Sequence, residues 1–142
     1  MARRILPVGV VLSFLLAGQA QAARLIATIE GTRNADGYLY VALFSKPDGF
    51  PDGNYSVQHT KLKAATETLT VIFDDLVPGT YAVGAYHDEN NNGRLDTSLI
   101  GYPKEGYALS NGIRAVMSRP RFIDAAFAVG GEGANVTLRI KY

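Results

Sequence analysis

The chain has no cysteine and no tryptophan among its 142 residues. Without cysteine, a disulfide, a thiol nucleophile and a thiolate metal site are all excluded. Only two histidines are present, His59 and His87, and they lie far apart in the sequence. A transition-metal site built from several imidazole ligands is therefore not expected. The remaining candidate ligands are oxygen atoms, which suit a hard cation such as calcium.

The sequence also lacks a strong excess of charge of either sign. It has 14 Lys and Arg residues against 13 Asp and Glu residues, a formal net charge of +1. Loss of Arg3 and Arg4 with an N-terminal leader would leave 12 basic residues (14 − 2) against 13 acidic ones, a net charge of −1. Nucleic-acid binding needs a basic surface, so no nucleic-acid partner is expected.

The N-terminus has the three parts of a secretory signal peptide. Arg3 and Arg4 supply positive charge, residues 5–17 form an apolar run, and Ala-Gln-Ala at 20–22 supplies a cleavage site. The apolar run is short for a membrane span. We predict a signal peptide at residues 1–22, with an uncleaved anchor as the alternative. The exported chain is expected in the periplasm, or alternatively outside the cell, with no transmembrane segment of its own.

Residues 23–142 are expected to form a single all-β domain. Apolar residues alternate with polar ones along most of the chain, which indicates strands with one buried face. About seven short strands separated by turns predict an antiparallel β-sandwich or barrel. The strand pattern is clearest at residues 24–30, 38–44, 68–73, 81–86, 122–129 and 136–140. Only residues 58–67 have spacing that suits a short helix, and their threonines argue against one.

Turns and loops separate these strands. Asn-Ala-Asp-Gly at 34–37 is a turn signal, because Asp-Gly supplies the positive φ that a tight hairpin needs. Two polar loops, residues 45–55 and 87–119, are much longer than a hairpin requires. Loops of this length in a compact domain are usually functional or disordered. The candidate sites are therefore expected in these loops.

The segment 88–96 has oxygen-bearing side chains at alternate positions. It matches the first half of the calcium-loop pattern D-x-[DN]-x-[DN]-G. The predicted ligands are the side chains of Asp88, Asn90, Asn92 and Asp96 and the backbone carbonyl of Arg94. The twelfth position is Leu99 instead of a bidentate Glu, so we expect a weak structural calcium site with a Kd of roughly 10⁻⁴–10⁻³ M. The alternative is a metal-free turn, since Asn and Asp hydrogen-bond their own turns.

Two further hypotheses concern the same long loop. In residues 101–110, Tyr102, Lys104 and Tyr107 are candidates to line a pocket for a sugar or a small anion. Alternatively, the tyrosines pin the loop to the sandwich and leave their hydroxyls in water.

The loop carboxylates can also be considered as catalytic groups. The candidates are Asp88, Glu89, Asp96 and Glu105, as paired carboxylates for glycoside hydrolysis. Glu89 or Glu105 can instead complete a calcium shell from outside the repeat. No nucleophile elbow or phosphate loop accompanies them, so a non-enzymatic module is the main expectation.

Several segments together resemble one known family. They are LVPGTYAV at 76–83, HDENNNGRLD at 87–96, GYPKEGY at 101–107 and Ser110-Asn111. In this order they are similar to the bacterial exported family of domains of unknown function numbered 2141, over about residues 25–142. Ala108 and Leu109 depart from the family pattern, which has Gly and an aromatic residue there. The resemblance implies a small secreted or periplasmic sandwich, immunoglobulin-like or transthyretin-like, without an established activity. An envelope protein or a small ligand is the expected partner.

Overall fold

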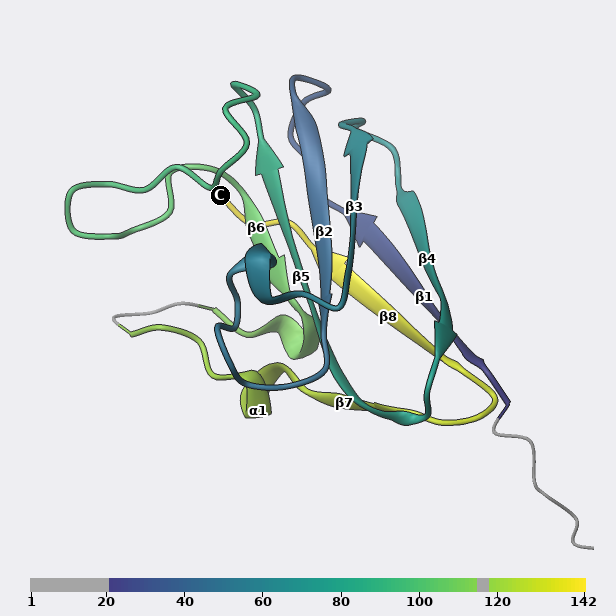
Figure 1. Ribbon diagram of the computed structural model, residues 1–142. Coiled ribbons are helices and arrows are strands. Elements are labelled where there is room, and N and C mark those ends of the chain that lie inside the picture. Colours follow the sequence, from purple (N-terminus) through teal and green to yellow (C-terminus); the bar gives the residue numbers. More distant parts are fainter. Residues whose placement is uncertain (1–20, 115–117) are drawn as a thin grey trace, which may run out of the picture.

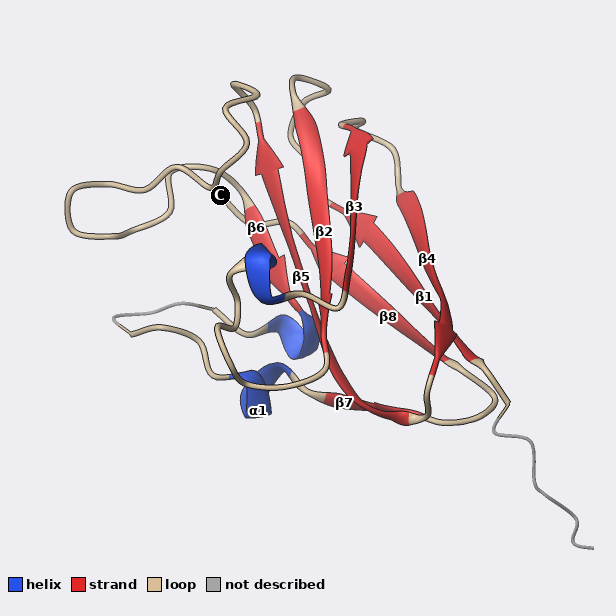
Figure 2. Ribbon diagram, in the orientation of Figure 1, coloured by secondary structure: helices blue, strands red, loops and turns tan. Residues whose placement is uncertain are grey.

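The computed structural model describes residues 21–114 and 118–142, so most of the predicted signal peptide at 1–22 lies outside the described residues. Strands dominate the described part, and its helices are short (Figure 2). The strands are β1 Ala23–Glu30, β2 Tyr38–Phe44, β3 Gln58–Lys63, β4 Leu69–Leu76, β5 Gly79–Asp88, β6 Tyr107–Leu109, β7 Phe127–Val129 and β8 Ala134–Arg139. The helices are α1 Phe122–Ala125 and the 3₁₀ turns η1 Gly53–Tyr55 and η2 Ser110–Gly112.

The strands form two facing sheets (Figure 1). One has three strands in the order β4-β1-β8, and the other has five, in the order β3-β2-β5-β6 with β7 beside β5. The predicted all-β sandwich is therefore confirmed. One strand pair departs from the antiparallel pattern, because β1 and β8 run parallel. No helix in residues 21–114 and 118–142 is long and apolar enough to cross a membrane.

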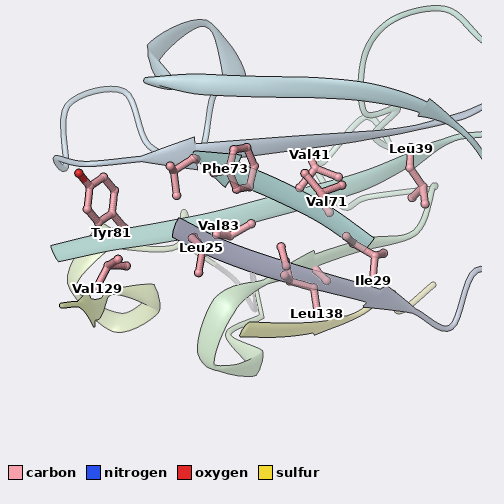
Figure 3. Packing of buried hydrophobic residues seen from close by; sticks show 14 of the residues in the cluster. Leu25, Ile29, Leu39, Val41, Val71, Phe73, Tyr81, Val83, Val129 and Leu138 are labelled. Carbon is pink, nitrogen blue, oxygen red and sulfur yellow. The ribbon is translucent and has the colours of Figure 1, made fainter. Parts of the chain in front are cut away.

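The core lies between the two sheets and follows the predicted alternation. In β1, Leu25 and Ile29 are completely buried, and in β2 so are Leu39 and Val41. Figure 3 shows these side chains meeting those of β4, β5 and β8, with Leu138 among them. Each fully buried aliphatic side chain contributes about 1.5–3 kcal/mol relative to exposure, so this layer supplies the main stabilisation of the fold.

Residues 58–63 form the edge strand β3, where Thr60 and its neighbours pair with β2, and no helix forms there, as the threonines indicated. Two local predictions differ from the structure. The strand expected at 122–129 begins as α1, because Phe122 and Ala125 are both buried on one side of a helical turn. The long loop expected at 87–119 contains the short strand β6, which pairs with β5.

The turn at residues 34–37 has a different role from the expected one. Gly37 has a φ of +62°, as its Asp-Gly context predicts. The turn joins β1 to β2, however, and these strands lie in different sheets. It is therefore a crossover between the layers, and no hairpin is formed.

Candidate functional site

The outer face of the five-stranded sheet carries rows of residues that face one another across the strands. Tyr40 of β2 pairs with Tyr86 of β5, which pairs with Tyr107 of β6. The rings of Tyr40 and Tyr86 stack with their centroids 4.9 Å apart and an interplanar angle of 2°. The next row contains Ala42 and Gly84, which have almost no side chain. An aromatic row therefore stands beside a row of small residues, here called the bare row, where the side chains of Leu109 and Phe44 lie over Gly84.

The bare row forms the floor of a groove. The groove has a volume of about 1180 Å³ and is lined by Ala42 and Gly84, by the tyrosine row, and by Phe44 and Leu109. Pockets that hold small organic ligands usually measure about 300–1,000 Å³. This hollow is therefore large enough for such a ligand, and most of its named walls are apolar or aromatic.

Two loops close one side of the groove. Phe50, in the loop after β2, packs edge-to-face on Phe44 with a centroid distance of 5.0 Å and on Phe122 at 5.8 Å. Arg119 ties the same loop to the segment before α1, because its Nε donates to the Phe50 carbonyl at 2.8 Å and its Nη2 to the Gly49 carbonyl at 2.6 Å. The opposite side is formed by residues from Gly93 to Pro103. The groove thus lies between loops that are fixed to the sheet.

Polar side chains also line this space, among them Asp52, Asn54, His59, Thr60 and Arg94. The Tyr86 hydroxyl donates to the Gly93 carbonyl at 3.1 Å. Burial, with smaller effects of nearby ionisable groups, raises the pKa of Tyr86 to about 12, so the hydroxyl stays protonated near neutral pH. Asp52 caps η1 by accepting the N–H of Asn54 at 2.9 Å. Arg94 is an open charge at the rim, since its side chain is 78% exposed, and it lies 3.5 Å from Asp96.

The Asp/Asn segment 88–96 lies directly beside the groove and is held by its own hydrogen bonds. Asp88 ends β5 and its side chain is completely buried. Its Oδ1 accepts the backbone N–H of Asn92 at 3.0 Å, and its Oδ2 accepts that of Gly93 at 2.8 Å. A charged acceptor for two backbone donors gives strong, directional bonds, so Asp88 fixes the start of the loop.

The other predicted ligands are also bonded within the loop. The side-chain oxygen of Asn90 accepts the N–H of Asn92 at 3.1 Å, and that of Asn92 accepts the N–H of Arg94 at 3.1 Å. The amide groups of Asn92 and Asn90 donate to the Asp96 carboxylate at 2.9 Å and 2.7 Å, which lowers the pKa of that carboxyl. The structure therefore brings all the predicted side chains into one loop and gives each of them a protein partner.

Glu105 closes the loop from outside the repeat. It is 6% exposed, and its two carboxylate oxygens accept the N–H of Glu89 and the N–H of Asp96, each at 2.9 Å. Glu89 itself turns away, because Arg33 donates to it at 2.9 Å and 2.6 Å and Asn34 at 2.7 Å. The hydrogen bond from Arg33 lowers the pKa of Glu89. Glu105 therefore joins two backbone segments, and Glu89 joins the loop to the side chains of Arg33 and Asn34.

His87 supports the other side of the same region. Its ring is completely buried, with Nε2 2.7 Å from the Asp36 carbonyl and Nδ1 2.6 Å from the Tyr142 hydroxyl. Since a carbonyl only accepts, Nε2 carries the proton and Nδ1 accepts from the tyrosine in the neutral ring. Within residues 21–114 and 118–142, no group of three or more His, Cys, Asp or Glu side chains is placed to hold a metal ion.

Of the three residues expected to line a pocket, two line the groove and one does not. Tyr102 and Tyr107 both line the groove, the first 57% exposed and the second 7% exposed. Lys104 is exposed and is not among the lining residues. Sequence reasoning did not identify Ala42 and Gly84, which make the hollow. One sequence feature could have indicated the hollow: the small residue Ala42 lies between the aromatic residues Tyr40 and Phe44 on one face of the strand.

The fold and this groove define a class of small all-β sandwich domain with a hollow on one outer face. The chain matches the family described as "Uncharacterized protein conserved in bacteria (DUF2141)" over residues 27–137, and it belongs to that family. The resemblance expected from the sequence is therefore confirmed. No curated protein and no solved structure gives a match.

Proposed function

We propose that this chain is an exported, non-enzymatic binding module that holds a small organic ligand in the groove on its five-stranded sheet. One observation carries the proposal: the groove over the small residues Ala42 and Gly84, beside the stacked pair Tyr40–Tyr86. Side chains normally fill such a surface, and a retained hollow with apolar walls and few polar groups is typical of a ligand site. Export rests on the signal-peptide features of the N-terminus.

The lining favours a ligand with an apolar or ring-shaped body. Tyrosine rings and the side chains of Phe44 and Leu109 offer dispersion contact over much of the walls. Charged side chains occur at the rim, where Arg94 is open to solvent. A sugar ring is the second candidate, because aromatic side chains also bind sugar rings and the groove has several tyrosines.

A non-catalytic role is supported by the use of the loop carboxylates. Asp88 and Glu105 accept backbone N–H groups, Asp96 accepts side-chain amides, and Glu89 pairs with Arg33. None of the four is among the residues that line the groove. A glycoside hydrolase needs two carboxyl groups on either side of a bound sugar, which this arrangement does not favour.

Filling the groove is expected to weaken ligand binding without unfolding the protein. Ala42→Phe places a ring over the bare row, and we expect it to raise the Kd of any groove ligand at least about tenfold, about 1.4 kcal/mol. The measurement is a thermal-shift screen of apolar, aromatic and sugar compounds on the wild type, followed by calorimetric titration of the hits on both proteins.

Ala128→Phe is the matched control. Ala128 is exposed on β7, also in an antiparallel pair, and does not line the groove. The Ala128→Phe variant should bind every hit with the affinity of the wild type. Hits that bind Ala42→Phe as tightly as the wild type would show that the groove is not the binding site.

A structural calcium ion at residues 88–96 stays a separate proposal. At about 1 mM calcium, a Kd of roughly 10⁻⁴–10⁻³ M adds about 0.4–1.4 kcal/mol to the free energy of unfolding. The Tm should then rise by about 2–6 °C relative to the protein in chelator. Asp96→Ala should remove this difference, whereas Asp74→Ala, an exposed carboxylate on β4, should retain it. An identical wild-type Tm in calcium and in chelator would exclude the ion.

A further inference from the structure

Residues 95–104, here called the finger, form a stiff hairpin-like projection beside the groove. Thr97 and Pro103 are bridged across it, and the N–H of Ser98 donates to the Tyr102 carbonyl at 2.7 Å. At its end the N–H of Gly101 donates to the Ser98 carbonyl at 2.9 Å, which closes a tight turn. Figure 1 shows this segment as the long green loop that projects away from both sheets.

The tip of the finger presents bare aliphatic side chains. The two central residues of the turn are Leu99 and Ile100, with relative exposures of 108% and 92%. Tight turns usually carry Gly, Asn, Asp, Ser or Pro at these positions, because these residues suit the turn backbone or hydrogen-bond to it. Tyr102, just behind the tip, is 57% exposed. Single exposed apolar residues are ordinary, but two adjacent ones held at the end of an ordered projection are a distinct surface.

Shape and charge identify the partner that suits this surface. The tip is narrow and convex, so a folded protein would need a matching socket, whereas the apolar layer of a bilayer accepts any apolar projection. Behind the aliphatic tip come Tyr102 and then Lys104. The other charged residue of the finger, Asp96, lies at its base, where the amide groups of Asn90 and Asn92 donate to its carboxylate. Aliphatic, aromatic and basic residues in this order match the acyl, interfacial and anionic headgroup levels of a membrane surface.

We propose that the finger inserts Leu99 and Ile100 into the interface of an anionic lipid bilayer. This role goes beyond ligand binding in the groove and does not depend on it. Ile100 and Tyr102 also line the groove, so insertion would bring the mouth of the groove to the lipid surface.

The absence of tryptophan allows a local test. Leu99→Trp gives the chain a single tryptophan at the tip. Its emission should shift to shorter wavelength when vesicles of phosphatidylglycerol and phosphatidylethanolamine are added, and brominated lipid should quench it. Val77→Trp, at a turn residue that is 70% exposed, should show neither effect. The signal comes only from the labelled position, so any vesicle binding by the apolar N-terminal run does not affect its interpretation.

Vesicle co-sedimentation measures how much each residue of the finger contributes to the affinity for lipid. Replacing Leu99 and Ile100 together by Ser should weaken binding about tenfold for each residue. Lys104→Ala should weaken it about fivefold on anionic vesicles, with little effect on phosphatidylcholine. The paired control, Val77→Ser with Ile123→Ser, removes two other exposed apolar side chains, with relative exposures of 70% and 69%, and should bind as the wild type.

Three outcomes would overturn the proposal. The first is an unchanged Leu99→Trp spectrum with vesicles, and the second is unchanged sedimentation of the Leu99/Ile100 variant. The third is a finger-dependent dimer in light scattering without vesicles, which would assign the tip to a second copy of the chain. Ala42→Phe should retain vesicle binding, so failure of the groove function and failure of lipid docking are distinguished.

Discussion

Asp88→Ala is expected to lower the free energy of unfolding by about 3 kcal/mol. The Asp88 carboxylate is completely buried and accepts the N–H groups of Asn92 and Gly93. Asn92 retains a second acceptor, the side-chain oxygen of Asn90, but Gly93 loses its only side-chain acceptor. Bonds to a charged acceptor contribute about 1.5–3 kcal/mol each, so most of the effect comes from these two donors.

Two substitutions separate this role from a general effect of charge. Asp88→Asn retains one acceptor oxygen and should restore about half of the lost stability. Asp74→Ala removes an exposed carboxylate that pairs with Arg24, and it should change the stability by no more than about 0.5 kcal/mol. Urea unfolding of all three variants in chelator provides the comparison. An Asp88→Ala variant as stable as Asp74→Ala would contradict the structural role of the buried carboxylate.

The Asp88 loop shows what the sequence could predict about the site and what it could not. Oxygen-bearing side chains at alternate positions correctly indicated one curled loop, and the structure places Asp88, Asn90, Asn92 and Asp96 within it. The role of Glu105 depends on a chain reversal between Asp96 and Glu105 that one sequence does not specify. Its two oxygens join the N–H groups at either end of the loop. The alternating pattern therefore identified the residues of the loop. Their hydrogen-bond partners depend on the tertiary structure.

The groove could not be predicted for a related reason. A hollow over Ala42 and Gly84 exists only because these two residues fall opposite each other in the β2–β5 register. If β5 were shifted by one residue relative to β2, Val83 or Ala85 would lie opposite Ala42 in place of Gly84. The side chains of these two residues belong to the other face of the sheet. The strand patterns of β2 and β5 are local, and both segments were correctly predicted as strands. The register between two strands depends on the whole sheet. It cannot be predicted from the sequence pattern of a single strand.

The fold class was predictable and its topology was not. Alternation in β1 and β4 reports which side chains are buried, because a strand turns successive residues to opposite faces. The parallel pairing of β1 with β8 joins two distant parts of the chain, and no local signal marks it. The first half of 122–129 became helical because Phe122 and Ala125 pack under a loop that the sequence did not place.

Gly37→Ala is expected to lower the free energy of unfolding by about 4 kcal/mol. Two independent effects add at this position. Gly37 has a φ of +62°, which costs a residue with a side chain about 1–2 kcal/mol. An added Cβ would also overlap the carbonyl oxygen of Asp88 on the neighbouring strand, and backbone on a central strand has little freedom to move. The sequence predicted the first effect from Asp-Gly, and only the fold reveals the second.

Two other glycines allow these effects to be measured separately. Gly112 has a φ of +65° with no atom within 4 Å of an added Cβ, so Gly112→Ala should cost about 1 kcal/mol from backbone strain alone. Gly131 has neither a positive φ nor a neighbour within 4 Å, and Gly131→Ala should change stability by no more than about 0.5 kcal/mol. Chemical denaturation of the three variants should give the order Gly37, Gly112, Gly131. Equal losses for Gly37→Ala and Gly112→Ala would mean that the close approach of Gly37 to Asp88 contributes nothing, because backbone strain would then account for the whole effect.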